Sequence, residues 1–173
     1  MEQDVLMQIA QAVQAAPQAA QAAAQAAARL DAGMIGAGLV FGLAALGSGF
    51  GIGIAGPATV GAWKKCYLAN KPAPMTMLAF TGNPLTQTFY GFLLMGPTRE
   101  AAGVMDPLLL LSYGVAAGLA LFFTAIVQGK IAACACDAMA EKNKGFAQYM
   151  IVMGIAESVA LFAMVFTLIA VTG

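Results

Sequence analysis

Residues 145–171 read GFAQYMIVMGIAESVALFAMVFTLIAV. This run is long enough to cross the hydrocarbon core of a bilayer, which takes about 20 apolar residues. Glu157 is the only charged residue inside it, and a charge near the bilayer centre costs at least about 2.5–3.5 kcal/mol. A charge at that depth is retained where it serves a function, so Glu157 indicates an ion or proton path.

The composition places the chain among integral membrane proteins. Hydrophobic residues make up 61% of the sequence and charged residues 9%, whereas soluble proteins carry about 25% charged residues. Eight basic and eight acidic residues balance, so no basic patch for nucleic acid is expected. Cys66, Cys134 and Cys136 form no CxxC pair, and the chain has no histidine, which favours structural thiols over a metal or redox site.

Four apolar segments are long enough to span a membrane, and we expect an all-α protein with four transmembrane helices. They pair into two tandem hairpins, 33–97 and 107–172. The segments are about 33–62, 77–97, 107–135 and 146–172.

The basic residues predict the orientation in the cell membrane. Lysines gather near the first and third loops, and the second loop and the N-terminal region have one arginine each. The positive-inside rule then places loops 63–76 and 136–145 in the cytoplasm and both termini outside. The basic residues that determine this predicted orientation are Lys64, Lys65, Lys71, Lys130, Lys142, Lys144, Arg29 and Arg99.

Residues 1–32 form a separate N-terminal extension rich in alanine and glutamine. Its glutamines recur every three or four positions, which predicts a weakly amphipathic helix, interrupted or bent at Pro17. The segment is too polar to span, and Glu2 and Asp4 stand where a secretory signal would be basic. We expect a helix on the outer surface or packed against neighbouring copies.

Glycines crowd the first membrane segment. Gly47 with Gly51, and Gly49 with Gly53, form small-xxx-small pairs on two sides of the helix, which allow close backbone approach on both flanks. Packing on two sides predicts a ring of identical protomers. Residues 51–56 also match GxGxxG, but no strand precedes them, so a nucleotide site is not expected.

Polar residues on two other segments lie at the depth of Glu157. Asn83, Thr86, Gln87 and Tyr90 follow the spacing i, i+3, i+4 and i+7, which places them on one helical face. The segment 107–133 contributes the single amide Gln128. These side chains can converge on the carboxylate between helices.

A carboxylate facing lipid without a partner must be neutralised by a proton or by Na⁺. Hard cations take several oxygen ligands, and Glu157, Thr86, Gln87 and Gln128 supply them. Pro84 lacks the N–H that would bond the carbonyl of Phe80, which loosens the local backbone. The two glutamines can alternatively serve as interhelical hydrogen-bond partners.

Three motifs carry a resemblance to the rotor-ring subunits of V-type rotary ATPases, known as subunit K or proteolipid c. Residues 83–91, NPLTQTFYG, resemble the P-x-T-Q-x-x-Y-G segment of their second helix. Residues 127–130, VQGK, resemble the A-Q-G-K of the third helix, and residues 156–158, AES, the E-T of the fourth. The glycine alternation over 47–53 is similar to the GxGxGxG of F-type c subunits.

The resemblance covers roughly residues 33–172 and is to the sodium-type, duplicated-hairpin form. The resemblance implies that the backbone carbonyl of Asn83 completes the Na⁺ site and that the Tyr90 hydroxyl hydrogen-bonds the carboxylate. Judged by its position alone, Tyr90 can also be an aromatic residue of the membrane interface. Where this chain has Asn83 and Ser158, the family pattern has leucine and threonine, respectively. A backbone ligand tolerates the first change.

The same resemblance implies the partners. Identical copies form a ring within membrane lipids, an arginine of a stator membrane subunit triggers ion release, and the cytoplasmic loops grip a central-stalk subunit. The chain itself shows no ATP site, so it is expected to translocate ions without being an enzyme.

The two hairpins are internal repeats. Residues 48–53, SGFGIG, align with residues 124–129, TAIVQG. Gln87 occupies roughly the place in the first hairpin that Glu157 occupies in the second, so we expect one ion per chain rather than two.

Two other classes of function fit a single buried glutamate. A small secondary transporter would exchange protons for a cationic substrate through Glu157, but small residues such as Gly154 and Ala160 predict a close-packed wall there instead of a cavity. A purely structural or channel-forming proteolipid would not need the polar cluster.

Overall fold

The computed structural model describes the backbone of residues 2–173, every side chain from residue 33 onward, and those of residues 7, 8, 11, 13–25 and 27. Within these residues the chain is helical, with no strand. The elements are α1 (Glu2–Leu68), α2 (Met77–Gly82), the 3₁₀ turn η1 (Asn83–Leu85), α3 (Thr86–Glu100), α4 (Pro107–Lys142) and α5 (Phe146–Thr172). The predicted all-α class is confirmed.

Three of the helical segments are long and apolar enough to cross a membrane: Gly33–Leu68, Pro107–Lys142 and Phe146–Thr172. The second predicted span is also helical, but the turn η1 divides it into α2 and α3. Pro84 lies in that turn, and its missing N–H explains why the regular α-helical pattern stops there.

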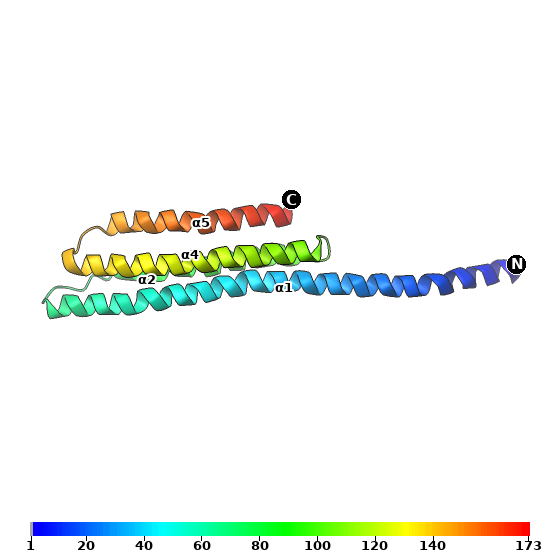
Figure 1. The fold of residues 1–173 in the computed structure, drawn as a ribbon, viewed down its shortest axis with the longest axis horizontal. Coiled ribbons are helices and arrows are strands. Elements are labelled where there is room, and N and C mark those ends of the chain that lie inside the picture. Colours follow the sequence, from blue (N-terminus) through cyan, green and yellow to red (C-terminus); the bar gives the residue numbers. More distant parts are fainter. Residues whose placement is uncertain (1) are drawn as a thin grey trace.

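The loops of the two hairpins lie at the same end of the bundle, and the linker that joins the hairpins lies at the other end (Figure 1). The connections after α1 and after α4 lie at one end, and the connection into α4 and the C-terminus lie at the other. The two loops at the first end are shorter than predicted, because α1 reaches Leu68 and α4 reaches Lys142. Lys64 and Lys65 therefore belong to α1 and not to a loop.

Of the two predicted possibilities at Pro17, an interruption or a bend, the interruption is wrong. α1 is one continuous helix of 67 residues that contains both Pro17 and Pro57, and its N-terminal part extends well beyond the bundle (Figure 1). A proline removes one hydrogen bond, but the alanines around Pro17 are the strongest helix formers and keep the neighbouring turns helical. At 1.5 Å per residue, α1 is about 100 Å long.

Glycines allow α1 and α4 to pack at close range. A Cβ on Gly114 would overlap the backbone of Gly36, and a Cβ on Gly129 would overlap the backbone of Gly51. α4 also packs against α5 on its other side (Figure 1). The second hairpin is thus held to the first mainly through α1 and α4, and α3 and α5 complete the bundle around the polar residues.

Candidate ion-binding site

Glu157 lies near the middle of α5, partly buried, with three hydrogen-bond donors around its carboxylate. The Tyr90 hydroxyl donates to Oε1 at 2.6 Å, and the Thr86 hydroxyl donates to Oε2 at 3.1 Å. Gln128 Nε2 on α4 also donates to Oε2. Three helices therefore meet at one carboxylate, and hydrogen bonds to a charged group are about twice as strong as neutral ones.

The turn at Pro84 determines how α3 presents its side chains. The Asn83 N–H bonds the carbonyl of Phe80, and the Thr86 N–H bonds the carbonyl of Asn83, in the tighter 3₁₀ pattern. The Thr86 hydroxyl also reaches the Asn83 carbonyl, at 2.9 Å. The Asn83 carbonyl is thereby held beside the carboxylate, linked to it through Thr86. Tyr90 follows Thr86 by one helical turn and so shares its face.

Three buried amide atoms of Gln87 and Gln128 are unsatisfied within the described residues. Both side chains are fully buried, with 0% of their surface exposed. Among the described residues, neither polar atom of Gln87 has a hydrogen-bond partner, and neither does Oε1 of Gln128. A buried polar atom without a partner costs about 1–3 kcal/mol, so these amides need either a ligand or another explanation.

The predicted site residues come together with one exception. Thr86, Tyr90 and Gln128 bond Glu157 directly, and the Asn83 carbonyl joins them through Thr86. Gln87 is on the same helix as Thr86 and Tyr90 but makes no hydrogen bond to this group within the described residues.

Sequence reasoning missed Ser48 of α1. Its hydroxyl is buried and accepts a hydrogen bond from the Thr88 N–H at 3.2 Å. Thr88 lies in the first turn of α3, where backbone N–H groups have no partner inside the helix. A lone serine within a glycine-rich apolar run was the available signal, because such a residue needs a polar partner in a membrane.

The four glycines of α1 that were predicted to mediate packing, at positions 47, 49, 51 and 53, divide into two faces. Gly47 and Gly51 are buried against α4, and a Cβ on Gly51 would also lie 2.7 Å from Cβ of Pro84, directly behind the site. At Gly49 and Gly53, no atom of the described residues lies within 4 Å of the position that a Cβ would take. Within one chain, therefore, only one of the two predicted packing faces is filled.

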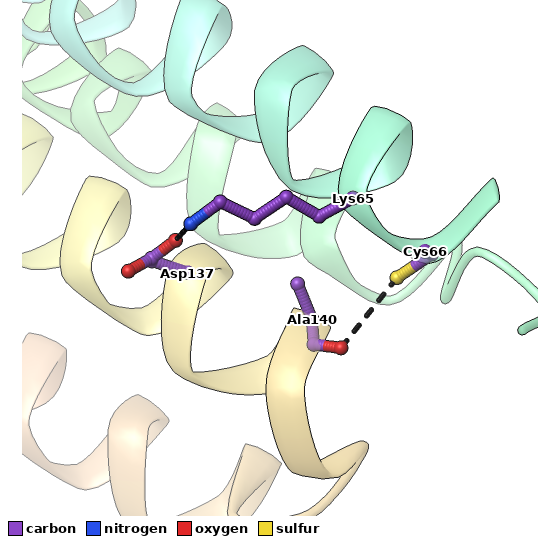
Figure 2. Close-up of polar contacts among 4 residues, drawn as sticks. All are labelled: Lys65, Cys66, Asp137 and Ala140. Carbon is purple, nitrogen blue, oxygen red and sulfur yellow. Dashed lines mark hydrogen bonds and ion pairs between the residues drawn. The ribbon is translucent and has the colours of Figure 1, made fainter. Parts of the chain in front are cut away.

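Other chemistry-bearing groups lie away from Glu157. Lys65 of α1 forms an exposed ion pair with Asp137 of α4, and the Cys66 thiol points at the carbonyl of Ala140 (Figure 2). The three cysteines are free thiols. Among the described residues, no three His, Cys, Asp or Glu side chains are grouped to hold a metal ion, so any cation at Glu157 would rely on amide, hydroxyl and carbonyl oxygens.

Comparison with known proteins shows what the chain is similar to. Residues 111–170, which include Gln128 and Glu157, match the family described as the C subunit of ATP synthase. The chain is also similar to the A-type ATP synthase subunit K of Methanocaldococcus jannaschii, with 34% identity over 142 residues. The match takes in 82% of this chain but 62% of that protein, so the chain spans about three fifths of its relative. By these two matches the chain is similar to the V- and A-type rotor-ring subunits, and most of its second hairpin matches the ATP synthase C-subunit family.

Proposed function

We propose that this chain is a rotor-ring subunit that carries one cation per chain through the membrane at Glu157. The observation that carries the proposal is the meeting of Thr86, Tyr90 and Gln128 at a single carboxylate inside an apolar bundle. A carboxylate at that depth is costly unless an ion or proton binds it in turn.

The hydrogen-bond pattern favours a bound cation. The Thr86 hydroxyl has one hydrogen, yet it lies within hydrogen-bond distance of both the Asn83 carbonyl and Glu157 Oε2. That single proton cannot serve both acceptors fully, and a positive ion between the oxygens of Thr86, Asn83 and Glu157 would offset their mutual repulsion. The Oε1 atoms of Gln87 and Gln128, which have no partner among the described residues, would offer two further oxygen ligands.

We infer that the ion is Na⁺ rather than H⁺. Na⁺ would be held by Glu157, Gln128, Gln87 and Thr86 together with the backbone carbonyl of Asn83. Tyr90 would orient the carboxylate by its hydrogen bond to Oε1. A proton needs only the carboxyl group, so it would leave the buried amide oxygens of Gln87 and Gln128 without a partner among the described residues.

Coupling to rotation follows from the ring. Identical copies would pack through the glycine faces of α1, and α5 would present Glu157 towards the stator subunit, whose arginine would trigger release. The connections after α1 and α4 would lie in the cytoplasm and contact the central stalk, with both termini outside, as the positive-inside rule indicates. The first hairpin has Gln87 where a second carboxylate would stand, so each chain would carry one ion.

The test is transport by the whole rotary ATPase. In vesicles containing the complex, Glu157→Gln should abolish ATP-driven Na⁺ uptake while rings still assemble, because the amide is nearly isosteric with the carboxylate. Glu100→Gln, at the end of α3, is the matched control and should leave uptake unchanged. Sustained Na⁺ uptake by the Glu157→Gln complex would contradict the proposal.

A further inference from the structure

Two buried hydroxyls of α1 contact the broken second span on either side of its turn. The Ser48 hydroxyl accepts a hydrogen bond from the Thr88 N–H of α3, at 3.2 Å. The Thr59 hydroxyl lies 2.6 Å from the Thr81 hydroxyl of α2. The turn η1 separates α2 from α3, so these two hydroxyl contacts enclose it.

Ser48 and Thr59 share one face of α1. They are 11 residues apart, which is three helical turns and about 20° more, or about 17 Å along the axis. Between them, a Cβ placed on Gly51 would lie 2.7 Å from Cβ of Pro84, so the proline of the turn packs directly on α1. The helix α1 therefore contacts the second span before, at and after the turn.

A third helix joins the contact at Thr59. The Cys136 thiol of α4 lies 3.2 Å from the Thr59 hydroxyl and 3.8 Å from the carbonyl of Met77. The Thr81 hydroxyl reaches the same carbonyl at 3.1 Å, and the Thr59 hydroxyl reaches the carbonyl of Ala55 at 2.9 Å. Each hydroxyl and the thiol can thus donate one hydrogen bond. A buried polar group of this kind, with every member paired, holds its helices in one arrangement.

Other buried hydroxyls bond only within their own helix. Thr98 of α3 and Thr124 of α4 donate to the carbonyl four residues earlier, at 2.7 and 2.8 Å. That bond satisfies a hydroxyl without a second helix. Thr124 is also the residue that aligns with Ser48 in the internal repeat. In the second hairpin, whose helices are unbroken, the hydroxyl at this place stays within α4; in the first hairpin it reaches the helix that is broken.

We infer that Ser48 and Thr59 are positioning residues for the ion site. The inference rests on the proposed function and adds two residues that act on the site through the turn. The Asn83 carbonyl and the Thr86 hydroxyl lie between the two hydroxyl contacts, where the regular α-helical pattern stops at Pro84. Ligands of a metal ion must be held within about 0.5 Å of the productive geometry. The two α1 hydroxyls supply a restraint that the turn itself lacks.

Hydrogen exchange of the purified ring without Na⁺ measures this restraint. Ser48→Ala removes the acceptor of the Thr88 N–H, and Thr59→Val removes the other hydroxyl but keeps the shape of the side chain. Peptides covering residues 82–88 should exchange about 2- to 12-fold faster in both variants, the effect of losing one hydrogen bond. Thr59→Ser keeps the hydroxyl and should exchange like the unmodified ring. Thr98→Val, at a buried hydroxyl of α3, is the matched control and should leave these peptides unchanged.

Protection of Glu157 by Na⁺ against carbodiimide measures the effect on the ion. Ser48→Ala and Thr59→Val should raise the Kd for Na⁺ about 10- to 100-fold, the usual loss when a residue that supports a metal ligand is removed. Thr98→Val should leave the Kd unchanged even where it lowers the unfolding temperature. If Thr59→Val does not assemble, Thr81→Val removes the same contact from the other helix.

The outcomes separate this inference from the proposed function. Faster exchange together with weaker Na⁺ binding supports the positioning role. Unchanged exchange, or faster exchange with an unchanged Kd, would overturn it. An unmodified ring whose labelling does not respond to Na⁺ would contradict the proposed Na⁺ site alone. In that ring, faster exchange in the two variants would still support the restraint on the turn, and unchanged exchange would still overturn it.

Discussion

Replacing Gln87 by leucine should change stability and ion binding in opposite directions. The Gln87 side chain is fully buried, and neither of its polar atoms has a hydrogen-bond partner within the described residues. A partnerless buried polar group costs about 1–3 kcal/mol, and leucine has a similar volume without polar atoms. Gln87→Leu should therefore stabilise the Na⁺-free ring by about 1–3 kcal/mol.

Binding of Na⁺ should weaken in the same variant. An interaction with a charged partner is worth about 1.5–3 kcal/mol, which corresponds to an increase of about 10- to 150-fold in Kd. Thermal unfolding of the purified ring without Na⁺, followed by a Na⁺ titration of the unfolding temperature, measures both effects. Gln148→Leu, at an exposed glutamine of α5, is the matched control. A Gln87→Leu ring that is less stable without Na⁺ and binds Na⁺ unchanged would refute the reasoning.

Three further predictions concern neighbouring residues. Tyr90→Phe removes the 2.6 Å hydrogen bond to Glu157 and should raise the Kd for Na⁺ by about 10-fold or more, a loss of at least about 1.5 kcal/mol, in the same titration. Thr86→Val should weaken Na⁺ binding and Thr86→Ser should largely retain it, because only serine keeps the hydroxyl; equal Kd values would contradict this. Gly51→Ala should lower the unfolding temperature, since its Cβ would overlap Ala125, whereas Gly56→Ala should not, because its Cβ meets open space; equal losses would contradict the packing account.

The sequence predicted the grouping of side chains around Glu157 better than it predicted the helix boundaries. A single buried carboxylate demands polar partners, and the spacing of Thr86 and Tyr90 places them on one face, so the grouping around Glu157 follows from periodicity. The partner of Ser48 could not be predicted. It depends on which N–H groups the turn at Pro84 leaves free, and that is decided by the three-dimensional path of η1 and α3.

The error at Pro17 arose because a local rule was applied without its surroundings. Proline disfavours a helix interior, but the alanines on both sides favour it more strongly when summed over several turns. The glycines were predicted to form packing surfaces on two sides of the helix. Sequence alone could not say which of these surfaces packs inside the chain. That assignment required the position of α4 beside Gly47 and Gly51.

The most direct test of the central claim is carbodiimide labelling of Glu157 with and without Na⁺. The reagent attacks the protonated carboxyl, and bound Na⁺ requires the ionised one, so Na⁺ and protons compete for one site. We expect millimolar Na⁺ to slow labelling of Glu157, and more strongly as the pH rises, whereas choline at equal concentration has no effect. Gln128→Leu should lose this protection but still label at low pH. Labelling of Glu157 that is indifferent to Na⁺ at every pH would contradict a sodium site and make the carried ion H⁺.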